Sequence, residues 1–208
     1  MCMVATTKQG ELNNYPDKQD YHKSKKHFTS LYNIIMEFEE IIKKQILIDI
    51  DTAPNIDEIY SGICLVANYE IVLLVHINFE IEEFDGFVII KNKDFERYRT
   101  WEEDDFSDLK NDNSRQIIDT IDVSTFVDLE SSLKSLTSEL VEIYTYDDND
   151  ENTFSVGKVL AVNNDSVEVH LMDDEAQWSD VEVIEFNDIS CIGFKTLYLQ
   201  ELKKYLVE

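Results

Sequence analysis

The feature that most constrains this chain is an internal repeat. The segment "GICLVANYEIVLLVH", residues 62–76, closely resembles "GKVLAVNNDSVEVH", residues 157–170. Aligning their two leading glycines also pairs two leucines and two asparagines, namely Leu65 with Leu160 and Asn68 with Asn163. A repeat of this kind predicts a fold built from two similar halves.

The alignment extends in both directions. Upstream, "ELVEIYTY" (139–146) falls on "KKQILIDI" (43–50) or, with a shift smaller by one residue, on "KQILIDID" (44–51), so another strand precedes the glycine in each copy. Downstream, His170 aligns with His76 if the second copy has lost one residue in the turn of this hairpin. A turn tolerates such a loss, because within a strand it would move every following side chain to the other face.

Each copy begins with a helical pattern. In "STFVDLESSLKSLTSEL", residues 124–140, apolar residues recur with the spacing of an amphipathic helix: Phe126, Leu129, Leu133, Leu136 and Leu140. The first copy has a similar stripe, formed by Leu31, Ile34, Phe38 and Ile41. We therefore expect a helix at the start of each copy.

The period then changes to two, which indicates strands. Five are predicted in the first copy, at 46–51, 61–67, 71–79, 86–92 and 95–101, and five in the second, at 141–146, 156–163, 166–172, 180–186 and 189–195. The third strand of the first copy is apolar on both faces. We expect its Val72 and Leu74 to form the contact between the copies.

Short, closely spaced strands after a helix are typical of a small β-barrel, which leaves no exposed edge. The segments "SGICLVANYEIVLLVHI" and "DGFVIIKNKDFERY" resemble the Sm-like (SH3-type) barrel, and "VGKVLAVNNDSVEVHL" with "VEVIEFNDISCIG" resembles a second one. The predicted fold class is mostly β with helices (α+β), as two duplicated small barrels, each a helix followed by about five antiparallel strands. The predicted domains are a flexible N-terminal segment (1–27), a first repeat (28–101), an acidic linker (102–122) and a second repeat with a C-terminal helix (123–208).

The resemblance implies RNA binding, since Sm-like proteins bind uridine- or adenine-rich RNA in oligomeric rings. The residues depart from that expectation. Where the family ends its fourth strand with an Arg-Gly pair, the copies have "IIKNKD" and "IEFNDI", and only Asn68 and Asn163 loosely match its nucleotide pocket. No RNA-binding residue is carried over, although a divergent RNA-binding protein remains an alternative.

The charge of the chain favours a different partner. It has 18 basic and 44 acidic residues, for a formal net charge of -26. Such a surface repels nucleic acid and anionic membranes and attracts basic proteins. Because no signal peptide or long apolar segment is present, we expect a cytoplasmic protein.

No chemical signature suggests an enzyme or a cofactor. The cysteines Cys2, Cys64 and Cys191 are scattered and odd in number, which favours neither disulfides nor a zinc site. The acidic clusters at 102–105, 147–151 and 173–175 lack the spacing of a calcium loop, so solvated loops are the simpler interpretation. We predict a non-enzymatic protein without cofactors.

The remaining candidate site is a protein-binding surface. The loops after the third strands, "INFEIEEFDG" and "MDDEAQWSDVE", combine carboxylates with large aromatics. The candidate partner-binding residues are Phe79, Phe84, Asp173, Asp174, Glu175 and Trp178. An anchoring aromatic among steering carboxylates is typical of an inhibitor of a basic protein, such as an immunity protein against a nuclease toxin. The alternatives are that these aromatics only close the barrels, and that the chain is a structural scaffold subunit.

Overall fold

The computed structural model describes residues 31–52, 59–79, 81–101, 113–146, 152–173 and 175–206. These residues contain four α-helices: α1 (Leu31–Lys44), α2 (Ser114–Ile118), α3 (Leu129–Ser135) and α4 (Leu197–Lys203). They also contain ten strands: β1 (Leu47–Thr52), β2 (Ile59–Ala67), β3 (Ile71–Asn78), β4 (Glu83–Lys91), β5 (Phe95–Thr100), β6 (Leu140–Tyr146), β7 (Asn152–Val162), β8 (Ser166–Met172), β9 (Trp178–Glu185) and β10 (Ile189–Phe194). The prediction of a mostly β, α+β fold is confirmed.

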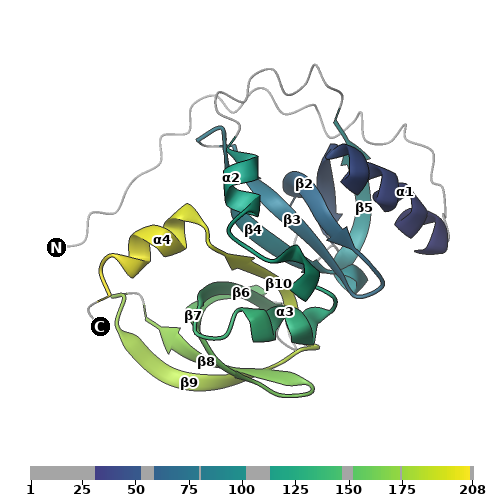
Figure 1. Cartoon of the computed structure of the whole chain (residues 1–208). Coiled ribbons are helices and arrows are strands. Elements are labelled where there is room, and N and C mark those ends of the chain that lie inside the picture. The colour runs from purple at the N-terminus through teal and green to yellow at the C-terminus, as the bar shows by residue number, and fades with distance from the viewer. Residues whose placement is uncertain are drawn as a thin grey trace.

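The strand order repeats within one sheet. The ten strands lie in the order β5-β1-β2-β3-β4-β10-β6-β7-β8-β9, so the second half has the same internal order as the first. All neighbouring strands are antiparallel. Figure 1 shows the first half at the upper right and the second half at the lower left.

The prediction of two separate barrels is wrong, because a single open sheet runs through both halves. Strands β4 and β10 join them, with Ile192 opposite Ile89 and Phe194 opposite Phe87. The physical reason is that an unpaired strand edge must be satisfied or protected. The edge of β4 is satisfied by a strand of the other half, and among the described residues β5 and β9 are the outer strands.

The strand pairing shows which residues of the two halves are equivalent. Gly62 lies opposite His76, and Gly157 lies opposite Leu171. Each hairpin then has a register irregularity at the same distance from its glycine. Leu171 is therefore the equivalent of His76, and the predicted alignment of His170 with His76 is wrong.

The residue that the second copy has lost lies further along the chain, in the connection between the third and fourth strands. Val72 lies opposite Ile90, and its equivalent Val167 lies opposite Ile184, at the end of a connection one residue shorter. Counting along the fourth strands then makes three pairs of positions equivalent: Phe84 and Trp178, Phe87 and Val181, and Ile89 and Val183.

Strand β3 is buried on both faces. On one face, Val72 and Leu74 pack against Phe38 of α1. On the other, Leu73 and Val75 belong to the larger core, which includes most of the apolar residues of the second half. The face of β3 that meets most of the second half is thus opposite to the one predicted.

The helix predicted over 124–140 is shorter than expected. A 3-10 turn at Val123–Thr125 comes first, and α3 begins after Asp128, whose carboxylate accepts the Ser131 N–H over 2.6 Å. The helix ends before Ser138, which has a positive φ of 72°, and Leu140 already belongs to β6. The apolar face of α3 packs into the larger core.

Candidate functional site

The two predicted aromatic residues of the first half are both held by their own chain. Phe84 is buried in the core, and its N–H donates to Asn113 Oδ1 over 3.3 Å. Phe79 is exposed to 41%, and its ring is stacked on Trp101 at a centroid separation of 5.7 Å. The Arg99 guanidinium lies 5.4 Å from the same Trp101 ring. Phe84 therefore offers no surface, and Phe79 belongs to a stack at the end of β3.

Asp173 and Glu175 of the second predicted loop are exposed. Asp173 organises this loop, because its Oδ1 accepts the N–H groups of Glu175 and Gln177, each over 2.9 Å. Glu175 is exposed beside it. Asp174 lies outside the described residues. The loop thus presents carboxylates immediately before β9.

Trp178, the first residue of β9, lies on the surface. Its ring stacks on His170 with a centroid separation of 4.7 Å, and it lies opposite Met172, which packs against α4. In Figure 1 the connection between β8 and β9 lies beside α4, whereas the connection between β3 and β4 lies beside α2. The structure therefore does not bring Phe79 and Trp178 together.

Trp178 belongs to a larger apolar surface, which we call the β9 face. It consists of Trp178, Val181 and Val183 of β9, with Glu168 and His170 of β8. His170 lies opposite Val181, and Glu168 lies opposite Val183. Directly opposed side chains of antiparallel strands share one side of the sheet. The β9 face is therefore a continuous strip along the two strands.

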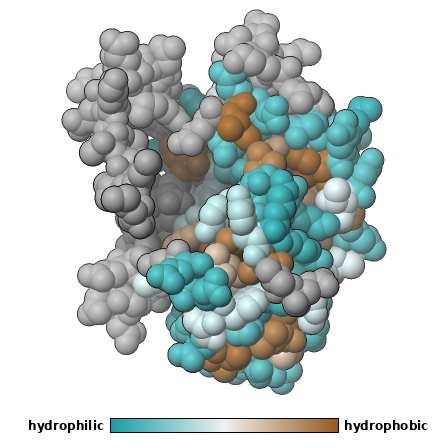
Figure 2. Space-filling model, turned by 90° about the vertical axis from the view of Figure 1, so that its left-hand side faces the viewer, coloured by the Kyte–Doolittle hydropathy of each residue, from teal (hydrophilic) through white to brown (hydrophobic). Residues whose placement is uncertain are grey.

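The β9 face is exposed where the equivalent part of the first half is buried. The exposed fractions of Trp178, Val181 and Val183 are 39%, 52% and 56%, whereas those of their equivalents Phe84, Phe87 and Ile89 are 3%, 0% and 0%. Strand β4 is enclosed between β3 and β10, whereas β9 ends the sheet of the described residues. Figure 2 shows apolar surface at the lower end of the molecule, where Figure 1 has β8 and β9. Contiguous exposed apolar surface is typical of an interaction site.

Carboxylates border this apolar strip. The sequence of β9 is WSDVEVIE, which contains Asp180, Glu182 and Glu185 but neither Lys nor Arg. Because side chains alternate along a strand, Asp180 and Glu182 lie on the opposite side from Val181 and Val183. A ligand along β9 would meet an apolar row on one side and an acidic row on the other.

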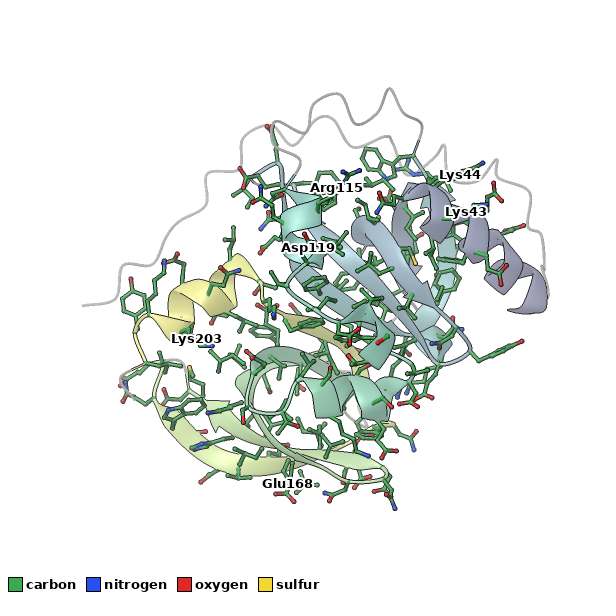
Figure 3. The ribbon with its side chains drawn as sticks, in the orientation of Figure 1. Lys43, Lys44, Arg115, Asp119, Glu168 and Lys203 are labelled. Atoms are coloured by element: carbon green, nitrogen blue, oxygen red, sulfur yellow. The ribbon has the colours of Figure 1, made fainter. Side chains whose placement is uncertain are left out.

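The basic side chains labelled in Figure 3 lie away from the β9 face. Glu168 points outward at the lower end of the molecule, whereas Lys43, Lys44 and Arg115 lie at the upper end. Lys203, on α4, lies between these two ends. Lys158 of β7 lies opposite His170, however, so one basic side chain adjoins the β9 face and partly offsets the carboxylates of β8 and β9.

Two carboxylates, the buried Asp49 and the half-buried Glu142, are engaged in holding the fold. They are equivalent, because Asp49 directly follows the residue opposite Gly62 and Glu142 directly follows the residue opposite Gly157. The predicted upstream alignment, which places Glu142 on Ile46 or Leu47, is therefore wrong. Asp49 accepts from Ser61 Oγ over 2.6 Å and from Trp101 Nε1 over 2.7 Å. Its equivalent Glu142 accepts from Thr196 Oγ1 over 2.7 Å, and burial raises the pKa of the Glu142 carboxyl. These contacts link β1 and β6 to their neighbours, so we assign the two carboxylates a structural role.

A cavity of about 340 Å³ lies between α2, β6 and α4. Its two cationic side chains contact their own chain. Lys195 Nζ donates to the Thr120 carbonyl oxygen over 2.7 Å, and Lys203 Nζ lies 3.9 Å from Glu139 Oε2. We therefore place the candidate site on the β9 face.

Sequence reasoning found Trp178 and its neighbouring carboxylates but missed Val181 and Val183. The alternation of acidic and apolar residues in "SDVEVIE", residues 179–185, was a usable signal. It predicted a strand there, but it could not show that this strand lies at the edge of the sheet.

Within the described residues, no helix is long and apolar enough to cross a membrane, and no three His, Cys, Asp or Glu side chains are placed to hold a metal ion. Comparison with known proteins gives no match: no family model fits the chain, and neither a curated protein nor a solved structure is similar to it.

Proposed function

We propose that this chain is a non-enzymatic binding module that captures a basic protein through the β9 face. The observation that carries the proposal is the exposed apolar strip of Trp178, Val181 and Val183, bordered by carboxylates. A partly exposed aromatic among apolar neighbours can anchor a partner, while the surrounding charges select its sign.

The net charge of -26 supports the same partner class. Long-range attraction between an acidic and a basic protein accelerates association, and it weakens as salt is added. Nuclease toxins are basic proteins, so an immunity-type inhibitor acting in the cytoplasm belongs to this proposal. A structural scaffold would bind through apolar contacts that salt does not weaken, which separates the two functions experimentally.

The repeated strand order supports an origin of the two halves by duplication of one Sm-like unit. In this view the fourth strand of the first unit, β4, pairs with a strand of the second unit, whereas the fourth strand of the second unit, β9, pairs on one side only within the described residues. RNA binding is the less favoured reading of the resemblance, because phosphates would approach a strongly acidic surface.

The test is a binding titration of the whole chain with a panel of basic proteins that includes nucleases, at low and high salt. We expect Trp178→Ala and Val183→Ser to weaken the tightest complex by about tenfold or more. The matched control is Val127→Ser, because Val127 is also exposed but lies outside the β9 face, on the segment before α3. The control should bind as the wild type does.

Equal binding by all three variants would show that net charge alone attracts these proteins, and the β9 face would then be excluded. Retention of RNA by the purified chain, lost on Trp178→Ala, would favour the RNA-binding alternative. Either result would contradict the proposal.

A further inference from the structure

The outer edge of β9, which pairs with no strand of the described residues, has a counterpart in the same molecule that is already occupied. Strand β4 holds the equivalent position in the first half, and β10 pairs with its outer edge. The hairpins β3–β4 and β8–β9 share the same register, including an irregularity near the start of the fourth strand in each. The pairing of β10 with β4 is therefore a template for what the edge of β9 can bind.

Hydrogen bonding shows which backbone groups of β9 face that edge. The Phe186 N–H donates to the carbonyl oxygen of Asp165 over 2.7 Å, and these two residues lie directly opposite each other. In an antiparallel pair, hydrogen-bonded and non-hydrogen-bonded pairs alternate. Ile184 and Glu182 therefore bond to β8, and Val183 directs its N–H and C=O away from β8.

The same reasoning applies to Val181, which precedes Val183 by two residues on the same strand. In the first half the Asn92 N–H donates to the Glu70 carbonyl over 2.7 Å, which directs the backbone groups of Ile89 and Phe87 toward β10. Val183 and Val181 are the equivalents of these two residues. Their outward N–H and C=O groups thus form a preformed edge for another strand.

We propose that β9 binds an extended segment of its partner as an additional antiparallel strand. The inference rests on the proposed function, because it takes the partner to be basic, and it adds the mode of binding and the pattern of the ligand. Side chains beside Val181 and Val183 would be apolar, and those beside Asp180 and Glu182 would be Lys or Arg. The ligand is therefore a strand in which basic and apolar residues alternate.

A second copy of this chain is a poorer occupant. Strand β5, at the other end of the sheet of the described residues, carries Arg97 and Arg99, but these form ion pairs with Asp51 and Asp49 of their own β1. Two copies would also each carry a net charge of -26 and repel one another. A basic partner would partly neutralise the net charge of -26, whereas a second copy would double it.

The experiment uses the whole chain and a short synthetic peptide of alternating lysine and valine. Its matched control is the same peptide N-methylated at every second residue, which keeps the side chains but removes the backbone donors of one edge. We expect the unmodified peptide to bind about tenfold more tightly or better. On binding, amide hydrogen exchange of Val181 and Val183 should slow by a similar factor, while that of Glu182 and Ile184 changes little.

Two variants at one position separate backbone pairing from side-chain contact. Val183→Pro removes the outward N–H without breaking a bond to β8, which an edge position tolerates. Val183→Thr keeps the N–H and the branched shape. We expect the proline variant to lose peptide binding and the threonine variant to retain most of it, with circular dichroism reporting whether each variant is folded.

Equal binding of the two peptides, or unchanged exchange at Val181 and Val183 in the complex, would overturn strand addition while leaving capture of a basic protein intact. If neither the peptides nor the basic proteins bind, the proposed function itself fails. Growth of molar mass with concentration in light scattering, abolished by Val183→Pro, would assign the edge to a second copy and contradict the basic occupant.

Discussion

Replacing either of the two glycines that begin the repeated hairpins should severely destabilise the fold. A Cβ at position 62 would lie 2.0 Å from the carbonyl oxygen of Val75 and 3.3 Å from the Cα of His76. Favourable contacts between such atoms need about 3.5 Å, so the neighbouring strand would have to move by more than 1 Å. Overpacking costs about 1–3 kcal/mol even where side chains can adjust. Because backbone blocks this position, we expect Gly62→Ala to cost about 3 kcal/mol or more.

Urea unfolding at pH 7, followed by circular dichroism, measures this cost. Gly157→Ala should behave similarly, since its Cβ would lie 2.6 Å from the carbonyl oxygen of His170. The control is Gly193→Ala, whose Cβ would lie 2.5 Å from Glu142 Oε2. This carboxylate also accepts from Thr196 Oγ1, so the cost includes any weakening of that hydrogen bond, but no backbone atom has to move. We expect the control to cost about 1 kcal/mol. If Gly62→Ala costs no more than this control, the close approach of β2 and β3 does not exist as described.

Three further predictions concern the core. Burial raises the pKa of Glu142, so the folded chain holds this proton more tightly than the unfolded chain, and stability falls as the pH rises above about 4.5. Glu142→Gln should therefore stabilise the fold at pH 7 but not at pH 4 in urea titrations, whereas the exposed Glu96→Gln should do neither. Phe38→Ala should lower the free energy of unfolding by about 3–5 kcal/mol in the same assay, because the ring is buried between α1 and the sheet. Cys64 and Cys191 are both buried, and burial raises the pKa of the Cys64 thiol, so both should react with a thiol reagent only as fast as the chain unfolds. Mass spectrometry of the labelled peptides separates them from Cys2, and rapid labelling at Cys64 or Cys191 in the folded chain would contradict their placement.

The strands could be predicted from sequence because their signal is local. Each predicted strand overlaps an observed one, as 71–79 overlaps β3 (Ile71–Asn78), since alternation of side chains is a property of the strand itself. The helix over 124–140 was less well predicted. Its apolar spacing continues to Leu140, but the backbone at Ser138 turns into a positive φ and the chain enters β6.

The joining of the halves could not be predicted, because it depends on which edges meet. The sequence pattern specifies which face of β4 is apolar, but not that Ile89 and Phe87 lie opposite residues of β10. The alignment of the two histidines failed for a related reason. The two histidines match in residue type, but the hydrogen-bonded register determines which positions are equivalent, and it makes Leu171 the equivalent of His76.

The residues of the candidate site also differ in whether local sequence or the position of their strand in the sheet determines their exposure. Trp178 was found because an aromatic among carboxylates in a loop is visible in sequence. Phe84, chosen by the same reasoning, is buried because β4 lies inside the sheet. Exposure of Val181 and Val183 follows only from the position of β9 at the end of the sheet, which no local pattern reveals.

The carboxylates of β9 have two physical consequences that are consistent with one another. An exposed edge with apolar residues such as Val181 and Val183 invites pairing with any other strand, and charged residues are a common protection against it. Asp180 and Glu182 provide this protection against acidic and neutral strands, including those of other copies of this chain. They give no protection against a strand that carries Lys or Arg opposite them. The residues that keep the edge free of unwanted partners are thus the same ones that select a basic partner, because specificity is a difference between affinities.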